Sequence, residues 1–523
     1  MSKRIICRVL VLLLGVVLAM PAVVAYASRN DTVRVGLRFD PATLNMLEMK
    51  TGFEIPVILT MNEPLLGSDP VTGDRIFSAL AESMQVMPNK KDIKIKIRKG
   101  ARFQTGDPLT AADVKWTYEQ CVNPTYDNMM AGPLDEIESI EVLDDHTLIF
   151  RFFEPYAGWK ELMWIGICSK KYYDSVGPEK FRKNPVGSGM FKFVARKVGE
   201  SVTVTLDPDY WGHSYLKKEF NIDKPNFKNV QFVIIPDDQT RIAMLETGEL
   251  DIVSDILPHQ VKQLQKNKRV KIKRIDKVPS LYGISHKPYA DPIMKDQYFC
   301  YAIKHAINRQ EIVDKVFLGE GYPLYLYASK TELGYDPKIK FDFNPQKAKE
   351  YLKKSSYKPG YPIMLTYGSD VPNASLVAAA IQQYLQNIGI TVKLRQLEAG
   401  TMATYSRTKD PRIGPLLLFA WHGGRDPSTR LMLSMKSNSP YSAWPDRPHK
   451  KEMDDLIDAQ ARELDEKKRA GLLAKYHGMW MENPSSTSLF GLNMIYATSD
   501  RVEYNWAPQE AFIFNLHLVK IVK

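Results

Sequence analysis

Residues 184–212 read NPVGSGMFKFVARKVGESVTVTLDPDYWG. Pro and Gly residues at its start favour a turn, because Pro fixes φ and Gly reaches positive φ without a Cβ clash. Two runs of alternating apolar and polar residues follow, 191–196 and 202–206, with Gly199 between them. A period of two is typical of strands, so the stretch predicts a β-hairpin.

The two faces of the first predicted strand differ in character. Phe191, Phe193 and Ala195 share one face, and Lys192 and Arg196 share the other. We therefore expect the three apolar residues to face a core.

The first 27 residues have the pattern of a secretory signal peptide. A basic start is followed by an apolar run at 9–20 and by Ala25-Tyr26-Ala27. The run is shorter than the ~20 residues that a membrane-spanning helix needs, so we expect cleavage after Ala27, with a retained anchor as the alternative. Cys7 precedes the run and no cysteine closely follows it, so a lipoprotein is not expected. The mature chain is predicted to be soluble and periplasmic.

Length and charge limit the possible functions. A mature chain of roughly 496 residues is long enough for two or three domains. The net charge of +11 falls to +8 once the three basic residues of the signal are removed, and the excess is spread along the chain. There are no stripes of basic and aromatic residues, so we expect a solvated basic surface and no nucleic-acid partner.

Three cysteines remain in the mature chain, Cys121, Cys168 and Cys300. None is in a C-x-x-C pair, so neither a zinc site nor thioredoxin-type chemistry is indicated. In an oxidising compartment one disulfide is possible. We expect Cys121 and Cys168 to form it, since both fall in the same predicted domain.

Helical and strand periodicities alternate on both sides of a β-rich segment. Thr110 and Asp113 open a capped helix, and the residues from 299 to 307 have apolar side chains at helical spacing. A strand is expected at 278–285, and a helix ending at Gly389 is followed by another strand. Such alternation predicts two α/β lobes.

Six strings of the sequence resemble, in order, those of the extracellular solute-binding proteins of family 5, which serve peptide- and nickel-type ABC importers. The strings are E-P-L at 63–65, T-A-x-D-V-x-x-T-x-E from 110, the stretch from 184, D-x-x-T-R-x-x-x-L-x-x-G-E-x-D-I from 237, A-I-N-R-x-x-I-V from 306 and L-Q-N-I-G-I-T-V from 385. Each string alone is weak, but their common order covers nearly the whole mature chain.

The resemblance implies an α/β, two-lobed periplasmic-binding-protein type II fold with an additional inserted β-rich domain. It implies a first lobe of residues 28–72, 187–280 and 491–523, an inserted domain of 73–186 and a second lobe of 281–490. The stretch from 184 would return the chain from the inserted domain to the first lobe. Strands near Ser280 and Phe490 would cross between the lobes and form the hinge.

Motifs of catalysis are absent from the sequence. There is no G-x-S-x-G, no H-E-x-x-H and no G-x-x-x-x-G-K, and no two of the nine His residues are four apart. We expect a binding protein rather than an enzyme, without a cofactor, a catalytic residue or a resident metal.

The candidate ligand site follows an apolar strand, 416–420. The strand leads into Trp421, His422, Gly423, Gly424, Arg425 and Asp426. Ligands of α/β proteins bind beside such strand ends, where Trp can form a flat wall, Gly lets backbone approach and Arg binds carboxylate or phosphate. The alternative is a strand followed by an Asp-Pro turn, with Trp421 in the core.

The resemblance implies that Trp421 matches a Trp of the peptide-binding members. Gly424 occupies the position of their acidic residue for the peptide amine, and Asp426 comes two positions later. The loop at 368–371 lacks the Arg that dipeptide binders use for the peptide carboxylate. These departures leave open an opine, a modified peptide, a sugar-peptide or, through His422, a metal chelate.

Other aromatic and basic residues are candidates for the walls of the site. Tyr282 lies on the predicted crossing strand, and Arg407 and Arg430 are further candidates. We expect Tyr210 and Trp211 to be structural, because they close a hairpin beside polar turns.

The sequence thus predicts the periplasmic substrate-binding component of an ABC importer, a monomer that captures a peptide-like solute between two lobes and delivers it to a membrane permease and its ATPase. The alternatives are a receptor for a non-peptide solute and a sensory or chaperone-like binding protein.

Overall fold

The computed structural model describes residues 29–68, 75–76, 80–276, 278–368, 371–422, 426–439, 441–444, 446–482, 485–505 and 514–523. The predicted signal peptide lies outside these residues, as do Gly423, Gly424 and Arg425 of the predicted ligand loop.

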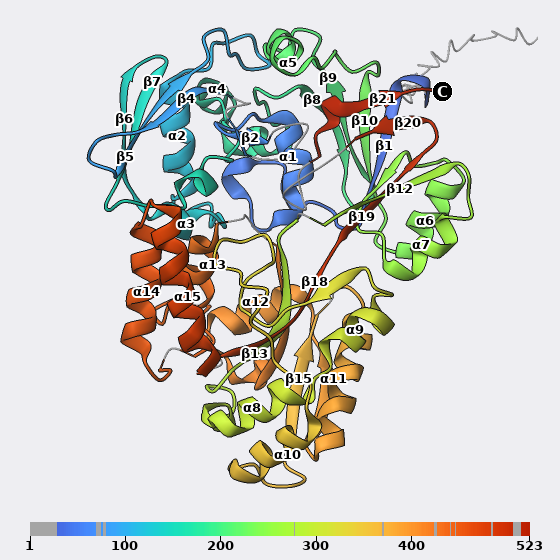
Figure 1. The fold of residues 1–523 in the computed structure, drawn as a ribbon. Coiled ribbons are helices and arrows are strands. Elements are labelled where there is room, and N and C mark those ends of the chain that lie inside the picture. The colour runs from blue at the N-terminus through green and yellow to red at the C-terminus, as the bar shows by residue number, and fades with distance from the viewer. Residues whose placement is uncertain are drawn as a thin grey trace, which may run out of the picture.

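The larger of the two main sheets has seven strands within the described residues, in the order β12-β19-β11-β1-β10-β9-β8. Its strands are β1 (Thr32–Leu37), β8 (Phe191–Lys197), β9 (Ser201–Leu206), β10 (Asn229–Ile234), β11 (Ile252–Val253), β12 (Val270–Ile275) and β19 (Met494–Ser499). The central strand β1 runs parallel to both β10 and β11. The helices α5 (His213–Phe220), α6 (Asp238–Glu246) and α7 (Pro258–Leu264) accompany this sheet. Figure 1 shows it at the top of the molecule.

The other main sheet has six described strands, in the order β14-β18-β13-β17-β15-β16. Its strands are β13 (Ser280–His286), β14 (Gly321–Pro323), β15 (Pro362–Tyr367), β16 (Thr391–Gln396), β17 (Leu416–His422) and β18 (Ser486–Leu492). The apolar faces of α8 (Gln297–Ala306), α9 (Arg309–Val316), α10 (Pro345–Lys354) and α11 (Ala374–Ile388) pack with it into one core. The remaining long helices of this half are α12 (Ala399–Arg407), α13 (Pro427–Ser434), α14 (Lys450–Arg462) and α15 (Glu466–Glu482).

The chain crosses between the two main sheets at two adjacent places. It leaves the larger sheet after β12 and enters β13, and it returns from β18 to β19 (Figure 1). Ser280 joins the two crossings, because its Oγ donates to the carbonyl of Leu492 (3.0 Å) and accepts from the N–H of the same residue (2.8 Å). These two hydrogen bonds therefore hold the two crossing segments against each other.

A third, antiparallel sheet in the order β4-β5-β7-β6 lies beside the larger one. It consists of β4 (Ala81–Val86), β5 (Asp92–Ile97), β6 (Ile137–Asp144) and β7 (Thr147–Phe152), and α2 (Ala111–Cys121) and α4 (Lys170–Lys183) pack with it. Its core also includes Met46, Leu65 and Ala461, so segments from both ends of the chain contribute to it. The remaining α-helices and strands of the described residues are short: α1 (Ile55–Met61), α3 (Ala131–Leu134), β2 (Gly67–Ser68), β3 (Arg75–Ile76), β20 (Val502–Tyr504) and β21 (Val519–Ile521).

Capping residues set the helix starts that the sequence indicates. The Asp113 carboxylate accepts from both the backbone N–H and the hydroxyl of Thr110 (3.0 and 2.8 Å), which closes a capping box at α2. Asn344 caps α10, with Pro345 at its first position. Gly389 ends α11 with a φ of 102°, a conformation that favours Gly.

The predicted hairpin of 184–212 forms, with β8 and β9 antiparallel. One detail of the prediction is wrong, because Ala195 is exposed. The register shifts between Phe193 and Ala195, and this β-bulge interrupts the alternation. Tyr210 is buried and donates to Glu63 Oε1 (2.6 Å), and Trp211 Nε1 donates to the Ser188 carbonyl (3.0 Å), so the aromatic pair is structural.

The expected disulfide between Cys121 and Cys168 is also wrong. Both residues are buried in the core of the third sheet, but both thiols are free, as is that of Cys300. Burial raises the pKa of Cys121 to about 12 and that of Cys168 well above its usual value. Disulfide chemistry needs a thiolate, and this apolar core disfavours one.

We expect Glu63→Gln to make the protein more stable at pH 8 and equally stable at pH 4. Burial raises the pKa of Glu63 from 4.5 to about 7 in the folded protein. Because the pKa is higher in the folded than in the unfolded protein, this carboxyl stabilises the fold fully below pH 4.5. The stabilisation is lost as the pH rises through about 7. Gln keeps an acceptor for Tyr210 and cannot ionise, so the unfolding temperature should exceed that of the parent by roughly 1–3 °C at pH 8.

Thermal unfolding at both pH values measures this difference. Glu249→Gln, at an exposed carboxyl, is the control and should show no pH-dependent gain. Equal unfolding temperatures of parent and Glu63→Gln at pH 8 would contradict a raised pKa of Glu63 in the folded protein.

Candidate functional site

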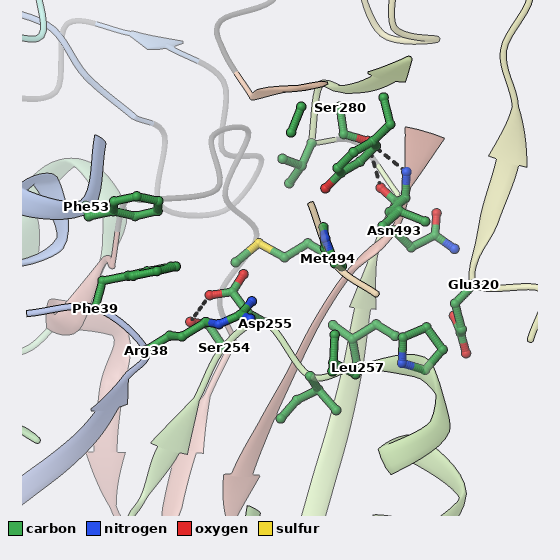
Figure 2. A pocket seen from close by; sticks show the side chains of 18 of the residues that line it. Arg38, Phe39, Phe53, Ser254, Asp255, Leu257, Ser280, Glu320, Asn493 and Met494 are labelled. Atoms are coloured by element: carbon green, nitrogen blue, oxygen red, sulfur yellow. Dashed lines mark hydrogen bonds between the residues drawn. The ribbon is translucent and has the colours of Figure 1, made fainter. Parts of the chain in front are cut away.

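A cavity of about 340 Å³ lies between the two main sheets, next to the crossings. Segments that follow strands of the larger sheet form one side, and residues of β13, β17 and the β18–β19 crossing form the other (Figure 2). Its lining consists of Leu37, Arg38, Phe39, Phe53, Pro56, Ser254, Asp255, Ile256, Leu257, Pro258, Val278, Ser280, Tyr282, Glu320, Pro372, Ala420, Trp421, Leu492, Asn493, Met494, Ile495 and Phe514. The volume is within the range of small-molecule sites.

Aromatic and basic residues that follow β1 shape the first side of the cavity. The rings of Phe39 and Phe53 are stacked, with centroids 4.0 Å apart. The guanidinium of Arg38 lies 5.5 Å from the centre of the Phe39 ring, and its Nε is 3.8 Å from Asp238 Oδ1. Arg38 therefore faces the cavity while it is paired with a carboxylate that is not part of the lining.

Asp255 follows β11 and lies beside Arg38 (Figure 2). Its carboxylate accepts from the Ser254 hydroxyl at 3.0 Å, and its side chain is accessible from the cavity. The walls of the cavity desolvate the carboxyl and raise its pKa, an effect that the Ser254 bond and the nearby Arg241 and Arg38 partly offset. Its φ is 57°, a left-handed conformation that is uncommon for residues other than Gly, although Asn and Asp adopt it more often than most.

Tyr282 and Trp421 form the aromatic part of the second side. Tyr282 is buried on β13 and stacks on Phe490, with ring centroids 5.0 Å apart. Trp421 is partly buried on β17, where it lines the cavity and also packs against the core around Leu281. It therefore combines the two roles that the sequence left open, a wall residue and a core residue.

Glu320 and Asn493 lie across the cavity from Phe39 and Phe53 (Figure 2). Glu320 Oε1 accepts from Arg274 Nε at 2.6 Å, and the backbone N–H of Asn493 donates to the Glu320 carbonyl at 3.3 Å. The loop before β14 is thereby attached to the β18–β19 crossing.

The structure brings together two of the predicted site residues, Tyr282 and Trp421, in this lining. His422 pairs through its backbone with Ser280 of β13, and its side chain is outside the description. Arg407 is exposed on α12 and is not part of the lining. Its role, like that of residues 423–425, stays a prediction.

Asp426 and Arg430 fix α13 instead of lining the cavity. Asp426 caps the helix through the N–H of Ser428 (2.8 Å) and forms a bidentate pair with Arg469 (2.5 and 2.6 Å). Arg430 is fully buried, pairs with Glu332 through two hydrogen bonds and donates to the Tyr327 carbonyl at 2.7 Å.

Sequence reasoning missed the charged residues of the site, Arg38, Asp255 and Glu320. The first two directly follow strands, and such ends form ligand sites in α/β proteins. Every predicted strand has such an end, but nothing in the sequence shows which strand ends face one another.

Two features are absent from the described residues. No group of three or more His, Cys, Asp or Glu side chains there could hold a metal ion. No helix among them is long and apolar enough to cross a lipid bilayer.

The model of one protein family, described as bacterial extracellular solute-binding proteins, family 5 middle, matches residues 75–442. The chain belongs to family 5. It is thus a solute-binding protein of the ABC-importer class, as the order of the sequence strings predicted.

One relative illustrates the level of sequence identity. The glutathione-binding protein GsiB of Escherichia coli O6:K15:H31 is 25% identical over 417 residues, which cover 78% of this chain and 77% of GsiB.

Solved structures resemble this chain more closely in fold than in sequence. The oligopeptide-binding protein AppA of Bacillus subtilis, in complex with a nonapeptide, has a TM-score of 0.80 at 22% identity, covering 94% of this chain and 99% of AppA. AgaA of A. tumefaciens R10, in complex with agropinic acid, has a TM-score of 0.79 at 23% identity, with 94% and 99% covered. These likenesses confirm the predicted two-lobed type II fold.

We expect Glu332→Gln to destabilise the protein by about 3–5 kcal/mol, because it leaves the buried guanidinium of Arg430 without its counter-charge. Denaturant unfolding measures the loss. Asp455→Asn breaks an exposed ion pair with Lys451 (2.6 Å) and should cost at most about 1 kcal/mol. A similar small cost for both variants would show that the Arg430 pair does not hold α13.

Proposed function

We propose that this protein is the periplasmic receptor of an ABC importer for a small peptide-like solute, which it encloses between its two lobes and presents to a permease. The observation that carries the proposal is the cavity between the main sheets, with Tyr282 and Trp421 on one side and Phe39 and Phe53 on the other. A solute in this cavity contacts both lobes at once, which is what a receptor that closes on its ligand requires.

The proposal includes the division of the chain predicted from sequence. Residues 28–72, 187–280 and 491–523 would form the first lobe, 73–186 the inserted domain and 281–490 the second lobe. The two crossings between the sheets, tied by Ser280 and Leu492, support a hinge at this place. The protein would act as a monomer, reach the periplasm through cleavage of residues 1–27 without a lipid anchor, and perform no catalysis.

The size of the cavity favours a short solute. A volume of about 340 Å³ lies at the lower end of the range of small-molecule sites, which suits an amino-acid derivative or a dipeptide better than a long peptide. The opine in AgaA shows that a relative of the same fold binds a small non-peptide solute, so an opine-like ligand is the second candidate.

Mass spectrometry of the solute released from natively purified protein, followed by calorimetry with that solute, tests the proposal. Micromolar affinity is about −8 kcal/mol, and we expect Trp421→Ala to weaken it roughly ten- to hundredfold because one wall of the cavity is lost.

Trp116→Ala is the matched control. Trp116 is partly buried against the core of the third sheet and is not part of the lining. Its ring is tilted against that of Tyr173, with ring centroids 5.1 Å apart. Unchanged affinity in Trp421→Ala would place the solute elsewhere, and turnover of the solute by the purified protein would contradict a pure binding function.

A further inference from the structure

The charged side chains in the described lining of the cavity are mostly acidic, although the protein as a whole is basic. The chain carries a net charge of +11, but the charged groups in the described lining are two carboxylates, Asp255 and Glu320, and one guanidinium, Arg38. A site lined with an excess of one sign attracts ligands of the other sign, most strongly where water is excluded.

The guanidinium is already engaged outside the cavity. Arg38 Nε is 3.8 Å from Asp238, a residue that also accepts a hydrogen bond from the buried Arg241. The same guanidinium lies near the Phe39 ring. Arg38 is therefore only partly available to neutralise Asp255 or to receive an acidic group of a ligand.

Asp255 has no ion-pair partner within 4.0 Å among the described residues, and Ser254 is the side chain that donates to it. The residue is held in a left-handed backbone conformation that directs an accessible carboxylate to the cavity. Positive φ at residues other than Gly is often found at ligand sites. Arg241 and Arg38 compensate the charge of this carboxylate only in part, so the site favours a cationic ligand group.

The apolar walls suit a cation as well. The stacked rings of Phe39 and Phe53 lie on the same side of the cavity as Asp255, and Trp421 lies on β17 opposite (Figure 2 shows the first two). Aromatic faces attract ammonium and guanidinium groups and also bury the methylene chains that carry them.

We propose that the solute is a small organic cation, whose protonated amine or guanidinium binds the Asp255 carboxylate while Phe39, Phe53 and Trp421 enclose its apolar part. Glu320 lies on the other side of the cavity, but its carboxylate is already paired with Arg274, so Asp255 is the main anionic group for the solute. The inference rests on the proposed function of the cavity and narrows its ligand from peptide-like solutes in general to basic ones.

Three dipeptides of equal length test the inference, Ala-Lys, Ala-Met and Ala-Glu, with affinities measured by calorimetry on the purified full chain. We expect Ala-Lys to bind at least tenfold more tightly than Ala-Met, and Ala-Glu to bind most weakly. Asp255→Asn should remove most of the preference for Ala-Lys over Ala-Met, since Asn tolerates the left-handed backbone but carries no charge. The α-amine is common to the three dipeptides, so the comparison between them isolates the charge of the side chain. Glu320→Gln should reduce the preference less, because Arg274 already shares its charge.

Glu466→Gln is the control for net charge, because Glu466 is exposed on α15 and is not part of the lining. It should leave all three affinities unchanged. A neutral or acidic solute released from the native protein, or equal affinities for the three dipeptides, would overturn the charge preference while the receptor function stands. If none of the three binds, the peptide-like form of the proposed function fails together with this inference.

Discussion

The two hydrogen bonds between Ser280 and Leu492 hold together the crossings on which the rest of the structure depends. Strands β13 and β18 belong to one sheet, β12 and β19 to the other, and the chain passes between the sheets beside this contact. Because both crossings are fixed to each other, the relative position of the two sheets is set by a short stretch of backbone. The cavity lies directly beside this stretch, so small changes at the crossings alter its width.

The walls of the cavity differ in how firmly they are supported. Tyr282 is buried and stacked on Phe490, and Trp421 packs on the core of its own lobe, so their positions follow from packing. Asp255 depends on one hydrogen bond from Ser254 and on an unusual backbone angle. The apolar walls are thus fixed by packing, while the Asp255 carboxylate is held by few contacts. We therefore expect the charge of Asp255 to determine which solutes bind.

Buried ion pairs position the helix that follows the predicted ligand loop. Asp426 and Arg430 both looked like ligand groups in the sequence, yet the first pairs with Arg469 and the second with Glu332. A buried guanidinium is strongly unfavourable without a partner, so such residues pair inside the protein wherever the fold provides a carboxylate. This fixes the start of α13 close to the end of β17.

The sequence by itself determined the elements, their order and the family. Periodicity and capping residues act locally, so they predicted the hairpin of 184–212, the start of α2 and the end of α11. The ends and crossings of the predicted strands gave two of the wall residues, Tyr282 and Trp421. The errors had tertiary causes: a bulge exposed Ala195, and an apolar core kept Cys121 and Cys168 as thiols. Only the tertiary structure decided which strand ends meet. Arg38, Asp255 and Glu320 are far apart in the chain, and their common cavity exists because two sheets face each other across the crossings, which no local pattern encodes.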